Sequence, residues 1–347
     1  MQKFKSVFLL FLIYLFPISC TFGQKNASLS PKIDSLVASK DPTFFNGVIS
    51  ITKDNKSIYR KAVGFRNLET KDKTLQLSDR FEIMSLSKQV CSVLILNEVE
   101  KSKINLNATI KTYLPNLSRS WADTVTVHQL LNHTHGIESL DKPLSFKPGT
   151  DFKYGNLSNV LLQQILEKVT HETYRQLAEQ LFEKNGLKNT YCYQSGNNKD
   201  LVAAHLVDEN TIKIPSKTLI NEGNLAADGI VTNAEDLLFW NDKLHSGKIL
   251  SKKMYQLMIK SSAQSQHDVF GKAKQGYGYN IRNIVENKIN YIGHTGLGDG
   301  FSALSIYFPK SKVNVVILQN VMIENSKLYY YYETAIKNMI LQSELID

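Results

Sequence analysis

The fold and the chemistry of this chain are decided by the stretch Phe81-Glu-Ile-Met-Ser-Leu-Ser-Lys-Gln-Val-Cys-Ser-Val-Leu-Ile-Leu96. From residue 90 onward it is apolar on nearly every side, which predicts a helix surrounded by protein. Ser85 and Lys88 lie at its start, three positions apart, so both side chains share one helical face. A hydroxyl beside an amine is the arrangement of a nucleophile and a base. Since the first N–H groups of a helix have no intrahelical partner, the N–H of Ser85 can also bind an oxyanion.

The spacing Ser-x-x-Lys is not unique in this chain, because Ser50/Lys53 and Ser139/Lys142 share it. Ser50 lies in an apolar run with the period of a strand, which turns its partner to the opposite face. Ser139 lies in a polar connection. Context therefore selects Ser85, and the alternative for that residue is a helix N-cap without chemistry.

The composition of the 347-residue chain is that of a globular protein with a formal charge of +9. The basic residues are scattered, and no nucleic-acid-binding motif accompanies them, so we predict no nucleic-acid partner. The expected partner is a small-molecule or peptide substrate. Oligomeric state is left open.

The N-terminus has the pattern of a secretory signal: Lys3 and Lys5 precede an apolar run over residues 7–18. The sequence predicts cleavage before Gln24, with lipid attachment at Cys20 as the alternative. No later segment is long and apolar enough to span a membrane. We therefore expect an exported protein, periplasmic or extracellular, that is free or held as a lipoprotein.

Strand patterns at both ends of the chain enclose a mostly helical middle. This order predicts an α+β fold in which an antiparallel sheet, built from both termini and flanked by helices, carries an inserted all-helical domain. The predicted divisions are residues 1–23 for the signal, 24–105 plus 214–347 for the sheet domain, and 106–213 for the helical domain. The strands expected are 46–52 and 57–64, paired as a hairpin, then 277–285, 289–293, 302–308 and 313–319, followed by a helix over 327–342.

Two further stretches carry side chains suited to catalysis. Tyr154 and Asn156 follow a Pro-Gly turn and precede a helix, where a phenol can relay protons and an amide can bind a substrate carbonyl. The alternative is a packed Tyr and an Asn that caps the helix. A glycine-rich segment holds His294 and Thr295, which can bind a carboxylate or assist proton transfer, and Leu297, whose N–H can be a second oxyanion donor. The alternative there is a hairpin with an incidental His.

His133-Thr-His135 raises a metal site, because two such imidazoles can share one ion. No nearby carboxylate or cysteine pattern supplies the remaining ligands. We predict a structural turn, with no metal and no cofactor in the protein.

Three motifs in chain order, Ser85-Leu-Ser-Lys88, Tyr154-Gly-Asn156 and His294-Thr-Gly296, resemble the signatures of the penicillin-recognising serine hydrolases. The resemblance is to the branch of class C β-lactamases, D,D-peptidases and related esterases, and covers roughly residues 40–320. It extends to Leu130-Leu-Asn-His-Thr-His-Gly136, Pro148-Gly, Asp228-Gly-Ile-Val-Thr-Asn-Ala-Glu-Asp236 and Gly276-Tyr-Gly-Tyr279.

The resemblance implies a cleft between the sheet domain and the helical domain that holds all three motifs. Ser85 would be the acylated nucleophile, with Lys88 and Tyr154 as the proton-transfer pair and either of them as the first base. Asn156 would bind the substrate amide, and His294-Thr295-Gly296 would form the far wall. The backbone of Ser85 and Leu297 would make the oxyanion hole.

Departures from the family pattern bear on the substrate. Class C β-lactamases typically have Lys-Thr-Gly where this chain has His294-Thr-Gly296, and His there resembles D,D-carboxypeptidases, D-aminopeptidases and esterases. Gly155, Ser158 and Asn159 also differ, without removing a catalytic group. The sequence thus predicts a serine hydrolase that cleaves an amide or ester of a small peptide, including peptides with D-residues. The alternatives are a promiscuous esterase, a weak β-lactamase, or a penicillin-binding sensor or scaffold without turnover.

Overall fold

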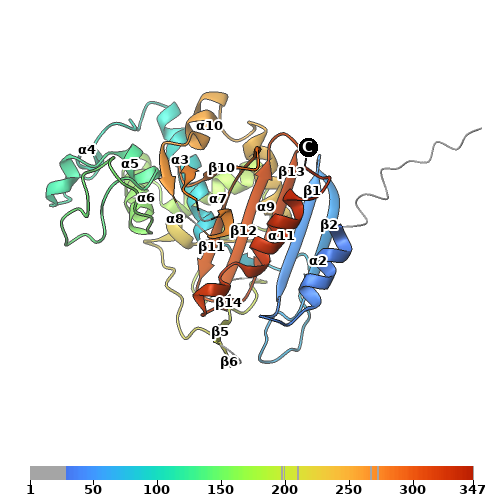
Figure 1. Cartoon of the computed structure of the whole chain (residues 1–347). Coiled ribbons are helices and arrows are strands. Elements are labelled where there is room, and N and C mark those ends of the chain that lie inside the picture. The colour runs from blue at the N-terminus through green and yellow to red at the C-terminus, as the bar shows by residue number, and fades with distance from the viewer. Residues whose placement is uncertain are drawn as a thin grey trace, which may run out of the picture.

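The computed structural model describes residues 29–346, apart from residues 197, 199, 209, 210, 266, 267 and 272. An eight-stranded antiparallel sheet forms the centre of the molecule (Figure 1). In spatial order its strands are β2 (Lys56–Val63), β1 (Gly47–Lys53), β13 (Val313–Gln319), β12 (Phe301–Phe308), β11 (Ile289–Gly298), β10 (Arg282–Glu286), β9 (Gln275–Tyr277) and β8 (Ala263–Ser265). The predicted sheet built from both termini is confirmed, because β1 pairs directly with β13.

The predicted hairpin near the N-terminus is confirmed as the antiparallel pair β1–β2. The run predicted over 277–285 is instead two strands, β9 and β10, which pair with each other. The chain turns between them, with the N–H of Gly278 donating to the carbonyl oxygen of Ile281. Asn280 has a φ of 51°, which is incompatible with a continuous strand. Apolar residues on both sides of this turn hid it from a pattern-based prediction.

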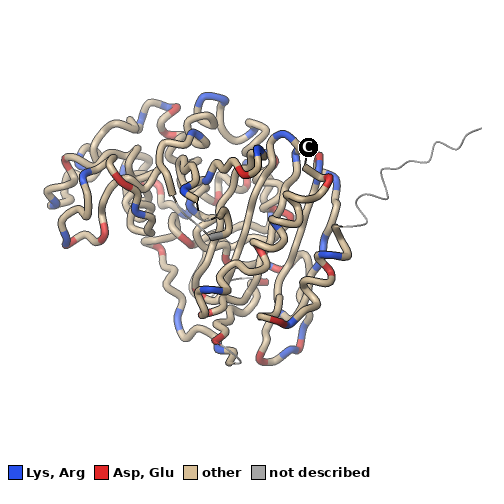
Figure 2. The backbone as a smooth tube through the Cα atoms, in the orientation of Figure 1, with Lys and Arg blue, Asp and Glu red and all other residues tan. Residues whose placement is uncertain are grey.

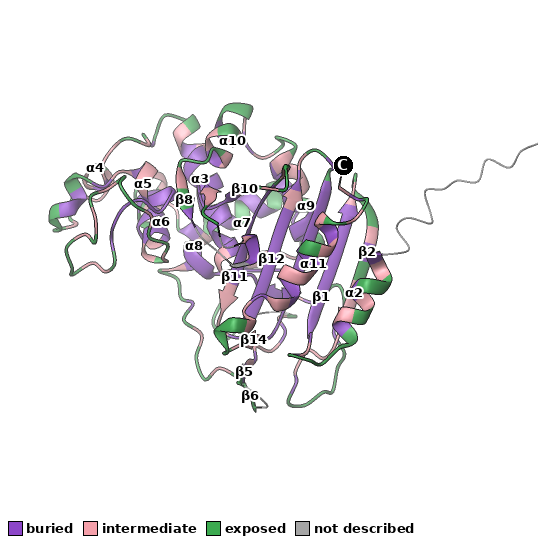
Figure 3. Cartoon of the chain, viewed as in Figure 1, coloured by how far each residue is buried: buried purple, intermediate pink, exposed green. Residues whose placement is uncertain are grey.

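Successive residues of the central strands face two different cores. Ile49 and Ile317 contribute to one core, while their chain neighbours Val48 and Leu318 contribute to the other. Strand side chains alternate between faces, so a strand covered on both sides must be apolar throughout. This explains the apolar run 315–318 in β13 and the burial of the whole strand (Figure 3).

One face of the sheet is covered by the two terminal helices, α2 (Leu29–Ala38) and α11 (Tyr331–Leu341), which lie side by side in Figure 1. Ile33 and Ile336, one from each helix, are fully buried in the same core as the strand residues. The sheet is thus closed on this side by segments almost 300 residues apart in sequence.

The remaining helices lie on the other face and beyond the β8 edge, and α9 packs against β13 and β1. Helix α3 is buried along almost its whole length, as the sequence predicts. These α-helices are α3 (Lys88–Glu100), α4 (Ile110–Tyr113), α5 (Val127–Leu131), α6 (Leu157–Thr170), α7 (Tyr174–Asn185), α8 (Leu225–Asp228), α9 (Ala234–His245) and α10 (Lys252–Ile259). The 3-10 helices are η1 (Met84–Ser87), η2 (Ser120–Asp123), η3 (Asp268–Phe270) and η4 (Ser326–Leu328), and η3 packs on the side of α11.

The segment 106–213 is helical only as far as Asn185, which corrects the expectation of an all-helical insertion. Its last part contributes short strands to two small sheets. These are β3 (Phe81–Glu82), β7 (Ile230–Thr232) and β4 (Tyr191–Cys192), and β14 (Met322–Ile323), β5 (Leu206–Asp208) and β6 (Thr211–Lys213), each in that spatial order. Such two- and three-residue strands depend on distant partners, so their own sequence does not reveal them.

Basic and acidic residues are interspersed over the molecule (Figure 2). Within the described part of the chain, no helix has the length and apolarity needed to cross a bilayer. The predicted signal, its cleavage before Gln24 and the lipid site at Cys20 fall outside the described residues.

Candidate active site

Ser85 is the second residue of η1 and lies directly ahead of α3. It does not cap either helix, because the N-cap positions are Ile83 and Ser87. Met84, just before it, has a φ of 47°, an uncommon conformation for a residue with a side chain. Backbone strain of this kind is held in place by surrounding structure and is typical of functional turns. The turn leaves Ser85 half-buried.

Lys88 has an exposed fraction of 0 %, and its ammonium group lies among four acceptors. Its Nζ is 2.8 Å from Ser85 Oγ, which confirms the predicted contact of these two side chains. Further acceptors are Asn156 Oδ1 at 2.8 Å and the carbonyl oxygen of Ala227 at 3.0 Å. The fourth is Asp228 Oδ1 at 3.3 Å. A lysine has three protons to donate only when it is charged, so this environment fits the ammonium form.

Asp228 is a central residue of the site that the sequence analysis did not single out. The hydroxyl of Ser85 donates to Asp228 Oδ1 over 3.0 Å, and the amide of Asn156 donates to Oδ2. The carboxylate also forms an ion pair with Lys88. It stands at the end of α8, followed by Gly229 and β7, in a sequence otherwise apolar or small. A lone carboxylate in such a run was the available signal.

Asn156 occupies the N-cap position of α6, but its side chain makes no capping bond. Its amide oxygen accepts from Lys88 and its amide nitrogen donates to Asp228. The side chain thus turns into the site rather than onto its own helix, as the functional interpretation expected. In this state the amide holds the lysine and the carboxylate in position, and its role in binding a substrate carbonyl stays a prediction.

Tyr154 lies over the site with an exposed fraction of 37 %. Its ring centre is 5.3 Å from Lys88 Nζ, and the ring stacks on the imidazole of His294 with 5.8 Å between centres. The hydroxyl makes no hydrogen bond to any residue that the structure describes. The structure therefore brings Tyr154 to Lys88 through the face of its ring, and a proton relay between them requires the ring to turn.

Strand β11 forms the opposite wall and carries His294, Thr295, Gly296 and Leu297. It runs so close to the nucleophile turn that a side-chain carbon added at Gly296 would lie 2.1 Å from the carbonyl oxygen of Ile83. Only glycine allows this approach. The residues just before Ser85 and the third motif are therefore brought together by backbone packing, which places Leu297 beside the turn.

The imidazole of His294 is 1 % exposed and both of its nitrogens contact protein groups. Nδ1 is 2.7 Å from the carbonyl oxygen of Thr295, to which it must donate, and Nε2 is 3.1 Å from the hydroxyl of Tyr277. A neutral ring with its proton on Nδ1 satisfies both contacts. A side-chain hydrogen bond also joins Thr295 to Tyr330.

Arg282, on β10, is a second residue that the sequence analysis missed. Its side chain is buried, with 3 % exposed, and its Nε and Nη1 atoms have no hydrogen-bond partner among the described residues. The guanidinium carbon is 5.9 Å from the ring centre of Tyr154 and 5.3 Å from that of Tyr277. No carboxylate of the described chain pairs with it. A cation within an apolar β run was the signal for this residue.

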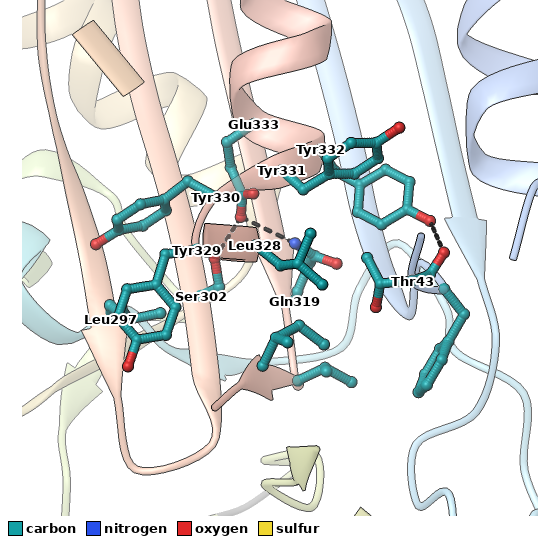
Figure 4. A pocket seen from close by; sticks show the side chains of 13 residues that line it. Thr43, Leu297, Ser302, Gln319, Leu328, Tyr329, Tyr330, Tyr331, Tyr332 and Glu333 are labelled. Atoms are coloured by element: carbon teal, nitrogen blue, oxygen red, sulfur yellow. Dashed lines mark hydrogen bonds between the residues drawn. The ribbon is translucent and has the colours of Figure 1, made fainter. Parts of the chain in front are cut away.

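The side chain of Leu297 lies beside the aromatic segment that leads into α11 (Figure 4). There the carboxylate of Glu333 accepts hydrogen bonds from Ser302 and from Gln319, the latter at 2.9 Å. These bonds link β12 and β13 to the start of α11, close to the end of β11 that carries Leu297. The role of the Leu297 N–H as an oxyanion donor stays a prediction.

His133 and His135 are both buried, and His133 is 3.1 Å from Asn280 Oδ1 and 3.2 Å from Ser158 Oγ. Its ring also lies 4.7 Å from that of Tyr154. Both nitrogens thus contact protein groups, as in a structural turn that supports Tyr154. The described residues contain no group of three or more potential metal ligands.

A model of the family described as β-lactamase matches residues 38–333. The chain belongs to this β-lactamase family. The family consists largely of serine hydrolases, and its fold is the antiparallel sheet with flanking helices described above.

Among curated relatives of this family member, Protein flp of Staphylococcus aureus (strain MRSA252) is 24 % identical over 319 residues. The alignment covers 84 % of this chain and 62 % of that protein, so the chain matches less than two thirds of its relative.

Solved structures share the fold. The D-amino acid amidase from Ochrobactrum anthropi SV3, complexed with L-phenylalanine amide, has a TM-score of 0.78 at 16 % identity, covering 92 % of this chain and 98 % of that one. EstCE1, a hydrolase with promiscuous acyltransferase activity, has a TM-score of 0.73 at 20 % identity, covering 90 % and 97 %.

Proposed function

We propose that this chain is a serine hydrolase that cleaves an amide or ester of a small peptide, D-residues included, through an acyl intermediate on Ser85. The observation that carries the proposal is that the Ser85 hydroxyl contacts two groups that can take part in transfer of its proton. Ser85 Oγ is 2.8 Å from Lys88 Nζ and 3.0 Å from Asp228 Oδ1. The D-amino acid amidase and the hydrolase EstCE1, which share the fold, act in the same general class of reaction.

In the proposed reaction, Ser85 Oγ attacks the carbonyl carbon while its proton passes to Asp228, the acceptor to which it already points. Lys88, charged and fixed by its four acceptors, stabilises the negative charge that develops. The N–H groups of Ser85 and Leu297 bind the oxyanion. When the bond to the leaving group breaks, the leaving nitrogen or oxygen takes a proton from Lys88 or Tyr154, and the proton held by Asp228 replaces it. Water then attacks the ester carbonyl and passes a proton to Asp228, and Ser85 Oγ regains that proton as the acid product leaves.

Arg282 supports a leaving group that ends in a carboxylate. It is a buried guanidinium without a carboxylate partner among the described residues, and buried cations are stabilised by such partners. It contacts Tyr154, which lies over Lys88. A substrate whose carboxylate reaches Arg282 would have its scissile bond near Ser85. This favours a peptide over a neutral ester as the substrate.

The test is labelling with a serine-directed fluorophosphonate and turnover of chromogenic esters, a cephalosporin and D-alanyl peptides. One covalent adduct on Ser85 with peptide turnover supports the proposal, while rapid turnover of esters or the cephalosporin alone supports the esterase or lactamase alternative. A permanent mass shift with penicillin and no turnover of any substrate supports the sensor alternative. Activity removed by a chelator and restored by zinc would overturn the serine mechanism.

We also propose that the protein is exported, on the basis of its N-terminal leader. Cell fractionation of the full chain and of a Cys20→Ala variant tests this. Exported wild-type protein in the soluble fraction supports cleavage before Gln24, whereas membrane attachment lost in Cys20→Ala supports the lipoprotein. Retention of both proteins in the cytoplasm would contradict export.

A further inference from the structure

A cavity of about 220 Å³ opens at the end of the β11–β12 hairpin, and Glu82, Asp299 and Thr218 are among its lining residues. Glu82 is three residues ahead of Ser85, and Asp299 is two residues beyond Leu297. His294 lies three residues from Leu297 in the other direction. Because a strand advances about 3.3 Å per residue, the cavity and His294 lie on opposite sides of the oxyanion donor, roughly 7 and 10 Å away along the chain. The cavity is thus on the side of the acyl group if Arg282 holds the leaving group.

Glu82 has no partner that would explain its burial. Its exposed fraction is 4 %, neither carboxyl oxygen hydrogen-bonds to another described residue, and Oε2 is out of contact with solvent. A buried carboxyl without a partner costs free energy that a ligand can recover. Burial first, and then the charges of Asp299 and Asp228, raise the pKa of Glu82 from 4.5 to about 8. At neutral pH the group is therefore largely protonated until a cation approaches it.

Glu82 forms no ion pair with the cations near it in the described chain. Tyr193 and Lys217 also line the cavity, and Lys217 is exposed and forms no ion pair within the described chain. Arg80 is turned away toward Asn189 and Asp200. Tyr191, across β7 from Glu82, contributes only a phenol.

Asp299 is the second carboxylate of the cavity, and its position is fixed. Oδ2 accepts from Thr218 Oγ1 at 2.9 Å and from the N–H of Leu219 at 2.8 Å. Both donors belong to the loop that forms the outer rim. Its other oxygen accepts no hydrogen bond from the described residues. The two carboxylates therefore come from different segments, one buried and one anchored, and share one cavity.

We propose that this acidic cavity, formed by Glu82 and Asp299, binds a primary ammonium group on the acyl portion of the substrate. This rests on the proposed function for the assignment of the acyl side. Binding ionises Glu82, so the proton that it carries in the empty cavity leaves to solvent as the ion pair forms. The ammonium can be the free α-amine of the residue that acylates Ser85 or an amine on its side chain. With Arg282 at the other end, the cleft selects small zwitterionic peptides.

The experiment compares three p-nitroanilides with one leaving group: D-alanine, N-acetyl-D-alanine and N-acetyl-D-lysine. Preference by at least about tenfold for D-alanine over its acetylated form identifies an α-amine site, and the same preference for the lysine compound identifies a side-chain amine site. Glu82→Gln, which keeps the shape, should abolish the preference by lowering turnover of the two amine substrates toward that of N-acetyl-D-alanine p-nitroanilide. The exposed Glu183→Gln is the matched control. Equal turnover of all three substrates, or a preference that survives in Glu82→Gln, would overturn the proposal.

A binding measurement separates this proposal from that of the serine mechanism. Calorimetry of the Ser85→Ala protein with D-alanine amide and with N-acetyl-D-lysine amide, in two buffers of different ionisation enthalpy, should show binding with proton release at pH 7. N-acetyl-D-alanine amide should not bind. If the amines bind while fluorophosphonate fails to label the wild-type protein, the serine mechanism is overturned and the proposal of an amine-binding cavity is supported. If labelling succeeds but neither amine binds, the cavity proposal fails alone.

Discussion

The two ends of the cleft differ in charge, in burial and in how their charged groups are supported. At one end Arg282 lies among the rings of Tyr154 and Tyr277, and no carboxylate of the described chain neutralises it. At the other end Glu82 and Asp299 line a cavity. Between them, Lys88 and Asp228 form an ion pair beside Ser85. The ion pair of Lys88 and Asp228 positions the nucleophile. The charged groups at the two ends have no ion-pair partner in the described chain and can therefore bind charged groups of a substrate.

This difference gives the cleft a direction. In the proposed complex a peptide would enter with its carboxylate toward Arg282 and its amine toward Glu82, and the reverse orientation would place like charges together. Because opposing charges at each end favour one orientation and like charges penalise the other, the polarity contributes specificity as well as affinity.

The largest effect is expected when the nucleophile is removed and the charged groups at both ends are kept. Ser85→Ala should lower kcat by at least about 10⁴-fold and abolish fluorophosphonate labelling, because the intermediate is an ester on this hydroxyl. Ligand affinity at either end should persist, measured by calorimetry. Circular dichroism establishes that the variant is folded. Labelling retained in Ser85→Ala would place the nucleophile elsewhere.

The next largest effect is expected at Asp228, the proposed proton acceptor beside Ser85. Asp228→Asn keeps the size of the side chain but removes the proton acceptor, so kcat should fall by at least about a hundredfold. Combined with Lys88→Met, the loss should be well below the product of the single losses, because the two groups act on one hydroxyl. Exposed Asp123→Asn is the control, with stopped-flow acylation rates as the measurement. An unchanged rate in Asp228→Asn would return the base role to Lys88 and Tyr154.

A smaller effect is expected at the cationic end. Arg282→Met should raise KM for peptides with a free C-terminal carboxylate by about tenfold to a hundredfold, and spare the same peptides with an amidated C-terminus. Exposed Arg119→Met serves for comparison. His294→Lys adds a second cation there and, if His294 contributes to the anchor, should improve cephalosporin acylation. Equal losses for free and amidated peptides would show that Arg282 is structural.

The remaining effect is in stability rather than activity, and it arises at the acidic end. Glu82 is neutral in the fold up to its pKa of about 8, whereas in the unfolded chain it ionises near 4.5. The stabilisation that the raised pKa of Glu82 implies is complete below pH 4.5 and is lost as pH rises toward 8. Over that range the free energy of unfolding falls by at most about 1.4 kcal/mol per pH unit. Glu82→Gln should flatten this part of the melting-temperature profile. Parallel profiles for wild type and variant would contradict the raised pKa.

Sequence patterns predicted the elements whose signals are local. The β1–β2 hairpin, β12, β13 and the buried α3 follow from periodicity and turn residues. The short strands β4 to β6 did not, because they have only two or three residues each and because β4 and β5 pair with strands far away in the chain. Local and distant contacts differ in the same way at the site. Ser85 and Lys88 are one helical turn apart, so their contact could be predicted, whereas Ser85 and Asp228 are 143 positions apart.

Glu82, Asp228 and Arg282 share the feature that could have identified them. Each is a charged residue inside an apolar or small-residue run, where burial is expected and a charge needs a reason. The sequence analysis quoted Glu82 and Asp228 within longer motifs and Arg282 within a strand, and assigned no role to their side chains. Its motifs located the centre of the cleft, but not the charged groups at its ends.

The full burial of Lys88 has a consequence for chemical probing. An amine closed in by four acceptors offers no lone pair to an acylating reagent and no path for that reagent to reach it. Among the lysines of the folded chain it should be modified only when the packing between η1 and β11 opens. The rate at which amine-reactive compounds modify Lys88 should therefore report the rate of local opening of the active site. A ligand that contacts both Arg282 and Glu82 should lower that rate.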